Sequence, residues 1–236
     1  MGMGSSALRP TVLTPEDPAF PSVLQPFFVE SRRGGLTIIG ETSLISEPSL
    51  GLICSVRCPG SIVLQTYEFF QCLKLNRRMV IGGFHSPMER ECLRIILSGR
   101  SPVIIFPARS IDRMRIRSEW RAFVAAGRLA IASAFQGKGR RSTVHLAEER
   151  NRIVAFLADE VIIPYGAPGS KTERLAREML EMKKSVRTFP GPDNASLIRL
   201  GAIPLTVPVA AKGLCTEESQ FTFRGKPDPS TPPHTE

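Results

Sequence analysis

The feature of this sequence that most constrains its fold is a regular alternation, starting at Leu52, between short apolar runs and longer amphipathic segments. The runs have strand length and many β-branched residues, and they occupy positions 52–56, 79–81, 102–106, 128–132, 161–163 and 186–189. Helix-length segments follow at positions 61–76, 86–99, 120–126, 142–158, 171–182 and 195–200. Strands and helices alternating at this spacing predict an α/β fold with a doubly wound, mostly parallel sheet.

One domain accounts for this pattern, and a chain of 236 residues can bury a core of that size. We place the domain at positions 36–208, with further strand candidates at 36–39 and 203–207. A proline-containing N-terminal extension, 1–35, precedes it. A polar tail, 209–236, follows and ends in KPDPSTPPHTE, a composition that predicts disorder.

The segment at positions 158–180 joins a strand to a helix through a turn that contains glycine and proline. Such a turn directs backbone N–H groups and the positive end of a helix toward one point, an arrangement that suits a phosphate. The residues that lead into the helix are Gly169, Ser170, Lys171 and Thr172. Their spacing is not that of a Walker A loop, so an ordinary strand-to-helix turn is the alternative.

In a parallel, doubly wound sheet, ligands bind outside the carboxyl ends of the strands. Residues just after each predicted strand are therefore candidates for a site. They are Ser55, Arg57, Gly82, Gly83, His85, Ser86, Arg109, Ser133 and positions 165–172, joined by Arg150 and Arg152 if their helix starts at the same edge. The run Ser86-Pro87-Met88-Glu89 has the pattern of a capping box and predicts a helix start.

The chain is basic, with 31 Lys and Arg against 22 Asp and Glu and a formal net charge of +9. This favours a polyanionic partner, because neutralised phosphates release counterions, although a merely basic protein is the alternative. No apolar run is long enough to span a bilayer, and the N-terminus lacks the apolar core of a signal peptide. We therefore expect a cytoplasmic protein without membrane contact.

The five cysteines, at positions 54, 58, 72, 92 and 215, are odd in number and lack the tight spacing of metal ligands. Cys54 and Cys58 are too isolated for a four-ligand zinc site. We expect reduced thiols and no metal.

Several short motifs occur in an order and spacing that are typical of one family. They are Asp17-Pro18-Ala19-Phe20-Pro21, the strand ending at Arg57, Gly82-Gly83-Phe84-His85-Ser86-Pro87-Met88-Glu89, Glu149-Arg150-Asn151-Arg152-Ile153-Val154, Gly169-Ser170-Lys171-Thr172, and Pro190-Gly191 through Asn194, Leu197-Ile198 and Gly201-Ala202. By these motifs, positions 17–205 resemble the DNA-processing protein A (DprA/Smf) family, whose domain is Rossmann-like. Ser55-Val56 replaces a Gly-Ser pair, Ser86 replaces an arginine, and the short tail leaves no room for a winged-helix module, which indicates a divergent member.

The resemblance implies a single-stranded DNA-binding protein that acts in DNA recombination or in uptake of foreign DNA (natural transformation). It also implies a homodimer, possible delivery of the strand to a recombinase, and no cofactor or catalytic residue. The apolar positions 203–207 at a sheet edge fit a dimer, because such an edge needs covering. The implied phosphate- or nucleic-acid-binding residues are Arg57, Gly82, Gly83, His85, Ser86, Arg109, Arg150, Asn151, Arg152, Gly169, Ser170, Lys171 and Thr172.

Two interpretations of the arginines are open. In the first, Arg57, Arg150 and Arg152 form the basic floor of a phosphate pocket. In the second, Arg150 and Arg152 pair with Glu148 and Glu149 on a solvated helix face. The arginines between positions 109 and 121 have two interpretations as well: they extend a groove that follows a nucleic-acid backbone, or they lie on a solvated basic loop.

The alternative function is a small-nucleotide-binding protein or a phosphoribohydrolase-like enzyme that uses the same pocket. Glu173 follows the glycine-bearing loop as in the phosphoribohydrolases, but the loop is shortened, so pairing of Glu173 with Arg177 is favoured. His85 could contact a base or transfer a proton, yet the sequence offers it no carboxylate or nucleophile as partner.

Overall fold

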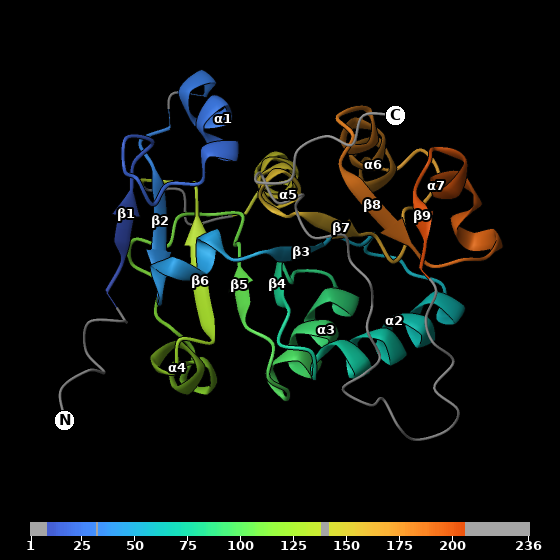
Figure 1. Ribbon diagram of the computed structural model, residues 1–236, viewed down its shortest axis with the longest axis horizontal. Coiled ribbons are helices and arrows are strands. Elements are labelled where there is room, and N and C mark those ends of the chain that lie inside the picture. Colours follow the sequence, from blue (N-terminus) through green and yellow to red (C-terminus); the bar gives the residue numbers. More distant parts are fainter. Residues whose placement is uncertain (1–8, 32, 138–141, 206–236) are drawn as a thin grey trace, which may run out of the picture.

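The computed structural model describes residues 9–31, 33–137 and 142–205, which build a nine-stranded sheet with helices on both faces (Figure 1). The strand order is β1-β2-β6-β5-β4-β3-β7-β8-β9. The strands are β1 (Thr11–Leu13), β2 (Leu36–Ile39), β3 (Ser49–Leu52), β4 (Met79–Gly82), β5 (Val103–Ile105), β6 (Leu129–Ser133), β7 (Glu160–Ile162), β8 (Ser185–Thr188) and β9 (Ile203–Pro204). All neighbours from β6 to β9 pair in parallel, which confirms the predicted doubly wound, mostly parallel sheet.

The helices divide between the two faces of the sheet. On one face lie α1 (Gln25–Glu30), α5 (Val144–Leu157), α6 (Lys171–Glu181) and α7 (Ala195–Arg199), and on the other α2 (Gly60–Leu73), α3 (Pro87–Leu97) and α4 (Ser118–Ala125) (Figure 1). The chain leaves β3 through α2 and builds β4, β5 and β6 outward on one side. It then crosses through α5 to β7, on the other side of β3.

Each face of the sheet carries its own apolar core, because successive side chains of a strand point to opposite faces. Along β4, Ile81 joins the core under α5 and α6, whereas Val80 joins the core over α2 and α3. Along β7, Val161 joins the core under α5 and α6, and Ile162 joins the core over α2 and α3. Continuous burial of these strands explains why they read as unbroken apolar runs in the sequence.

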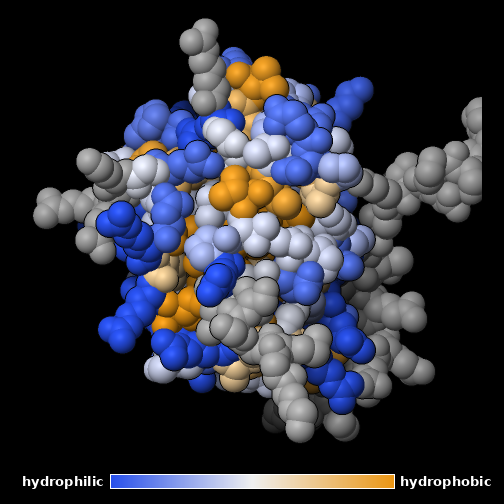
Figure 2. Space-filling model, turned by 90° about the vertical axis from the view of Figure 1, so that its left-hand side faces the viewer, coloured by the Kyte–Doolittle hydropathy of each residue, from blue (hydrophilic) through white to orange (hydrophobic). Residues whose placement is uncertain are grey.

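Part of the N-terminal extension packs onto this sheet. Strand β1 pairs antiparallel with β2, and β2 pairs antiparallel with β6. The carboxylate of Asp17 accepts the backbone N–H of Thr14 at 2.6 Å and fixes the turn after β1. Phe20 then packs edge to face against Phe28 of α1, with ring centroids 5.0 Å apart. The side of the molecule that carries the β1 edge shows small apolar groups among polar side chains (Figure 2).

Three expectations need correction or narrowing. The strand expected at positions 52–56 is β3, Ser49–Leu52, three or four residues earlier, because the chain already turns away from the sheet after Cys54. Strand β9 spans only Ile203–Pro204, and Val207 lies outside the described residues. Three cysteines carry free thiols, but Cys72 is disulfide-bonded, which contradicts the expectation that every thiol is reduced.

None of the helices in the described ranges is both long enough and apolar enough to cross a membrane.

Candidate phosphate and nucleic-acid site

The sheet changes its winding direction at β3, so the loops after β3 and β7 leave toward opposite faces. Such a switch point is where open α/β sheets bind ligands. The two loops are joined by two hydrogen bonds of Ser55, one from its backbone and one to its side chain. Its N–H donates to the carbonyl of Tyr165 at 3.0 Å, and its hydroxyl accepts the N–H of Ala167 at 3.3 Å. The loop that carries the exposed Arg57 is therefore held against the turn after β7.

Glu89 fixes the neighbouring loop, between β4 and α3. Its carboxylate is buried and accepts three backbone N–H groups, from His85 at 2.8 Å, Ser86 at 3.0 Å and, across to the end of β3, Cys54 at 3.1 Å. The Ser86 hydroxyl accepts the Glu89 N–H in return, which completes the predicted capping box. This one carboxylate thus sets the relative position of two of the loops at the switch point.

The backbone between β4 and α3 is also conformationally unusual. Phe84 has φ 47°, in the left-handed region that non-glycine residues rarely adopt, and its ring is buried. Such a conformation costs on the order of 1–3 kcal/mol and persists only where the surroundings determine it. Strain of this kind gathers at binding sites, and here it lies next to Gly83 and His85.

The free thiols of Cys54 and Cys58 form a hydrogen bond with each other in the loop after β3. The hydrogen bond with Cys58, together with burial, raises the pKa of Cys54 well above its usual range. The same hydrogen bond lowers the pKa of Cys58. No group of three or more His, Cys, Asp or Glu side chains in the described part of the chain is arranged to hold a metal ion.

The loop between β7 and α6, with its Gly169–Thr172 motif, is closed by its own helix. The Gly169 N–H donates to the carboxylate of Glu173 at 2.7 Å, and the Ser170 hydroxyl caps α6 through the Glu173 N–H. Lys171 forms an ion pair with Glu148 on α5, and Thr172 is buried. The expected pairing of Glu173 with Arg177 is therefore wrong, because the carboxylate turns back to the loop amide.

Arg150 is the most unusual charged residue at this edge of the sheet. It is only 5% exposed, and its guanidinium lies against Gly83, where a Cβ atom would overlap it. Nη1 donates to the Phe106 carbonyl at 3.1 Å, but Nε is buried without a partner, and no carboxylate among the described residues pairs with the group. Burial lowers the pKa of the Arg150 guanidinium, and the nearby charge of Glu89 partly opposes this.

Arg150 and Arg152 do not share a site, and neither pairs with Glu148 or Glu149. Arg152 is exposed and donates through Nε and Nη2 to Glu178 of α6, at 3.1 and 2.9 Å. The carboxylate of Glu149 pairs with Arg33 at 2.9 Å instead. Residues two apart on a helix point about 200° apart, which separates the two arginines. The half-buried Asn151 lies between them in the sequence.

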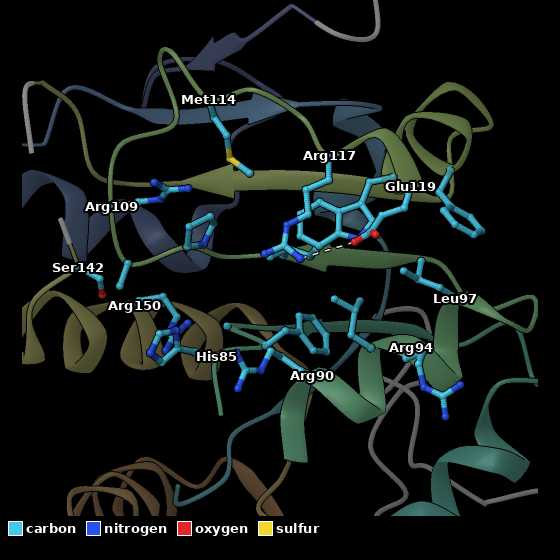
Figure 3. A pocket seen from close by; sticks show the side chains of 18 of the residues that line it. His85, Arg90, Arg94, Leu97, Arg109, Met114, Arg117, Glu119, Ser142 and Arg150 are labelled. Atoms are coloured by element: carbon cyan, nitrogen blue, oxygen red, sulfur yellow. Dashed lines mark ion pairs between the residues drawn. The ribbon is translucent and has the colours of Figure 1, made fainter. Parts of the chain in front are cut away.

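The Arg150 side chain helps to line a pocket of about 830 Å³ between α3 and the β5–α4 connection (Figure 3). Four of the predicted site residues meet here, namely Gly83, His85, Arg109 and Arg150. Three further arginines line the pocket: Arg90, Arg94 and Arg117. The pocket does not include Arg57, Gly82, Ser86, Asn151, Arg152 or the Gly169–Thr172 loop.

The pocket is strongly basic. Five arginines line it, and Glu119 is the one carboxylate among its described lining residues. Arg117 pairs with Glu119 at 3.5 Å and Arg94 with Glu91 at 2.6 Å, whereas Arg90 and Arg109 have no ion pair within the described ranges. The connection that carries Arg109 is held by the Ser133 hydroxyl, which donates to the Arg109 carbonyl at 2.8 Å. The site can therefore bind an anion with several charge-assisted hydrogen bonds.

The fold and the site define a Rossmann-like α/β protein with an arginine-rich pocket beside its switch point. Among solved structures, the chain is similar to DNA processing protein A (DprA) from Streptococcus pneumoniae, with a TM-score of 0.69 and 18% identity over 83% of this chain and 71% of that chain. It is similar to DNA processing protein A from Helicobacter pylori, described for its single-stranded DNA binding mode, with a TM-score of 0.61 and 18% identity over 82% and 87%. No family model and no curated protein matches the sequence. The chain thus has the fold of DprA.

Proposed function

We propose that this protein binds single-stranded DNA at the arginine-lined pocket and acts in the cytoplasm in DNA recombination or in uptake of foreign DNA. The shared fold with DprA supports the proposal, since the Helicobacter pylori protein is described as binding single-stranded DNA. The same resemblance motivates two further proposals, a homodimer and delivery of the strand to a recombinase.

The observation that carries the proposal is the buried, unpaired guanidinium of Arg150. A buried charge costs several kcal/mol unless a partner of opposite charge satisfies it. Arg150 makes one bond to a carbonyl and leaves Nε without an acceptor, while its side chain lines an open basic pocket. A phosphate in the pocket would supply the opposite charge that this guanidinium lacks.

The arginines around the pocket extend this contact beyond one phosphate. Arg90 and Arg94 are four residues apart on α3, so they lie on the same face of that helix, and Arg109 and Arg117 lie across the pocket from them (Figure 3). A row of cations on both sides of a groove follows a phosphodiester backbone without reading its sequence. His85, which lines the pocket, remains a proposed contact, as do Arg57 and Lys171 of the neighbouring loops.

The second candidate is a small-nucleotide binder, and the size of the pocket favours it. A volume of about 830 Å³ is within the range of small-molecule sites. Hydrolysis has less support, because the carboxylate of Glu119 is paired with Arg117 and lies at the opposite end of the pocket from Arg150 (Figure 3).

A competition experiment distinguishes the two candidates. We expect a labelled single strand to be displaced by unlabelled single strand at concentrations at least about 10-fold below those of any mononucleotide, because the strand offers several phosphates. Duplex of equal length should compete less well. If a mononucleotide displaces the strand as effectively as the strand itself, or is hydrolysed on incubation, the second candidate replaces the first.

A further inference from the structure

The two ends of the pocket differ in chemistry. At one end lie His85, Arg109, Ser142 and Arg150, all polar or charged (Figure 3). At the other end, Leu97 of α3 faces the start of α4, which carries Arg117 and Glu119 (Figure 3). A ligand that fits both ends needs an anionic group at the first and an apolar group at the second.

Apolar side chains of three elements line the pocket, and the contact with Arg117 places Trp120 at the second end. Leu93 and Leu97 are four residues apart on α3, Ile105 comes from β5, and Trp120 and Phe123 come from α4. Trp120 and Phe123 are only partly buried, although each packs against the core below it. An aromatic wall that faces an open pocket over an apolar floor is a surface on which a flat ring can stack.

Arg117 adds a second planar group to this end of the pocket. Its guanidinium carbon lies 4.8 Å from the centroid of the Trp120 ring, so the exposed guanidinium covers one face of the indole and adds its own plane to the stack. Both kinds of plane stack on nucleobases in nucleic-acid complexes.

We propose that the end formed by Leu97, Arg117, Trp120 and Phe123 binds a nucleobase, while the Arg150 end binds the phosphate of the same or the adjacent nucleotide. This rests on the proposed function, and it adds a base to a site that otherwise recognises only phosphates. The base belongs either to a nucleotide within a strand or to a free nucleotide. These two sources share the chemistry of the site and differ in what the protein would bind in solution.

Trp120 is the single tryptophan of the chain, so its fluorescence reports on this end of the pocket. The intact protein is titrated with an oligothymidylate of about 12 nucleotides and with an abasic strand of the same length. Strand binding is followed independently by the anisotropy of a label on the strand. We expect the oligothymidylate to quench Trp120 and to bind about 5- to 100-fold more tightly than the abasic strand, since stacking on an aromatic ring contributes that much per base.

Two variants complete the test, with thermal unfolding as a check on folding. Phe123→Leu retains the fluorophore, and we expect it to bring the affinity for the oligothymidylate closer to that for the abasic strand. Trp120→Phe should preserve most of the difference, because an aromatic face remains. Thymidine monophosphate forms a separate arm: quenching by it at the concentrations where the strand binds assigns the subsite to a free nucleotide.

If both strands bind equally and Trp120 emission is unchanged, the base subsite is overturned while the proposed DNA binding stands. If neither strand binds but thymidine monophosphate quenches Trp120, the proposed DNA binding fails and the base subsite stands. If neither strands nor nucleotide affect the protein, both fail.

Discussion

Replacing Arg150 with methionine is expected to weaken single-stranded DNA binding by about 10- to 100-fold, because it removes a charge-assisted contact of roughly 1.5–3 kcal/mol. The same change should lower the free energy of unfolding by no more than about 1–3 kcal/mol, since the Phe106 carbonyl loses a donor while an unpaired buried charge is removed. The guanidinium now makes a single bond, to the Phe106 carbonyl, and has no carboxylate partner among the described residues. Anisotropy titration and thermal unfolding measure the two effects.

Arg152→Met is the matched control. Arg152 lies two residues further along α5, but it is exposed and pairs with Glu178 at 2.9 Å. We expect less than about a two-fold change in affinity, and a loss of stability below about 1 kcal/mol, as for other surface ion pairs. Equal losses of binding for the two variants would show that general positive charge, rather than the buried guanidinium, attracts the strand.

Replacing Glu89 with glutamine should produce the second large effect, a loss of about 2–4 kcal/mol in the free energy of unfolding. The carboxylate accepts three backbone N–H groups, from Cys54, His85 and Ser86. Glutamine has the same shape but only one oxygen, so at least one buried N–H would face another donor. For a chain of this size, the melting temperature should fall by about 5–15 °C.

Glu91→Gln serves as the control on the same helix. Glu91 pairs with Arg94 on the surface at 2.6 Å, and this bond lowers the pKa of its carboxyl. Because the Arg94 side chain is 71% exposed, the loss should be below about 1 kcal/mol. A melting temperature that falls equally in both variants would contradict the assigned role of Glu89.

The sequence predicts the fold well because the alternation of buried strands and amphipathic helices is strong and local. The capping box from Ser86 to Glu89 is also a local signal, and the structure contains it. The end of β3 is harder to predict, since the run from Leu50 to Val56 is mostly apolar, Gly51 lies inside the strand, and Ser55 comes three residues after its end. Pairing with β4 and β7 sets that end, and such pairing is not visible in a single sequence.

The candidate site was predictable only in part. The rule that ligands bind at the carboxyl ends of strands selects Gly83, His85 and Arg109, and all three line the pocket. The rule does not show that Arg150 is buried and Arg152 is not, although their spacing on a helix places them on different faces. It also omits Arg90 and Arg94, because their position depends on the gap left between α3 and α4.

The bonds of charged groups near the site were the least predictable feature. Glu173 has Arg177 four residues away, a spacing that favours an ion pair on a helix, yet it accepts the Gly169 N–H instead. Lys171 finds its partner, Glu148, on another helix. Both outcomes depend on how α5 and α6 pack together, which no local pattern encodes.

The most direct test of the account is the affinity for labelled single strands of about 4, 8 and 16 nucleotides, measured at about 50 and about 200 mM salt. If several arginines bind successive phosphates, affinity should rise with length until the strand fills the pocket. With about three to five contacts, each adding about −0.7 to the slope of log K against log salt, affinity should fall about 10- to 100-fold between the two salt concentrations. An affinity that is indifferent to both length and salt would contradict single-stranded DNA binding at this site.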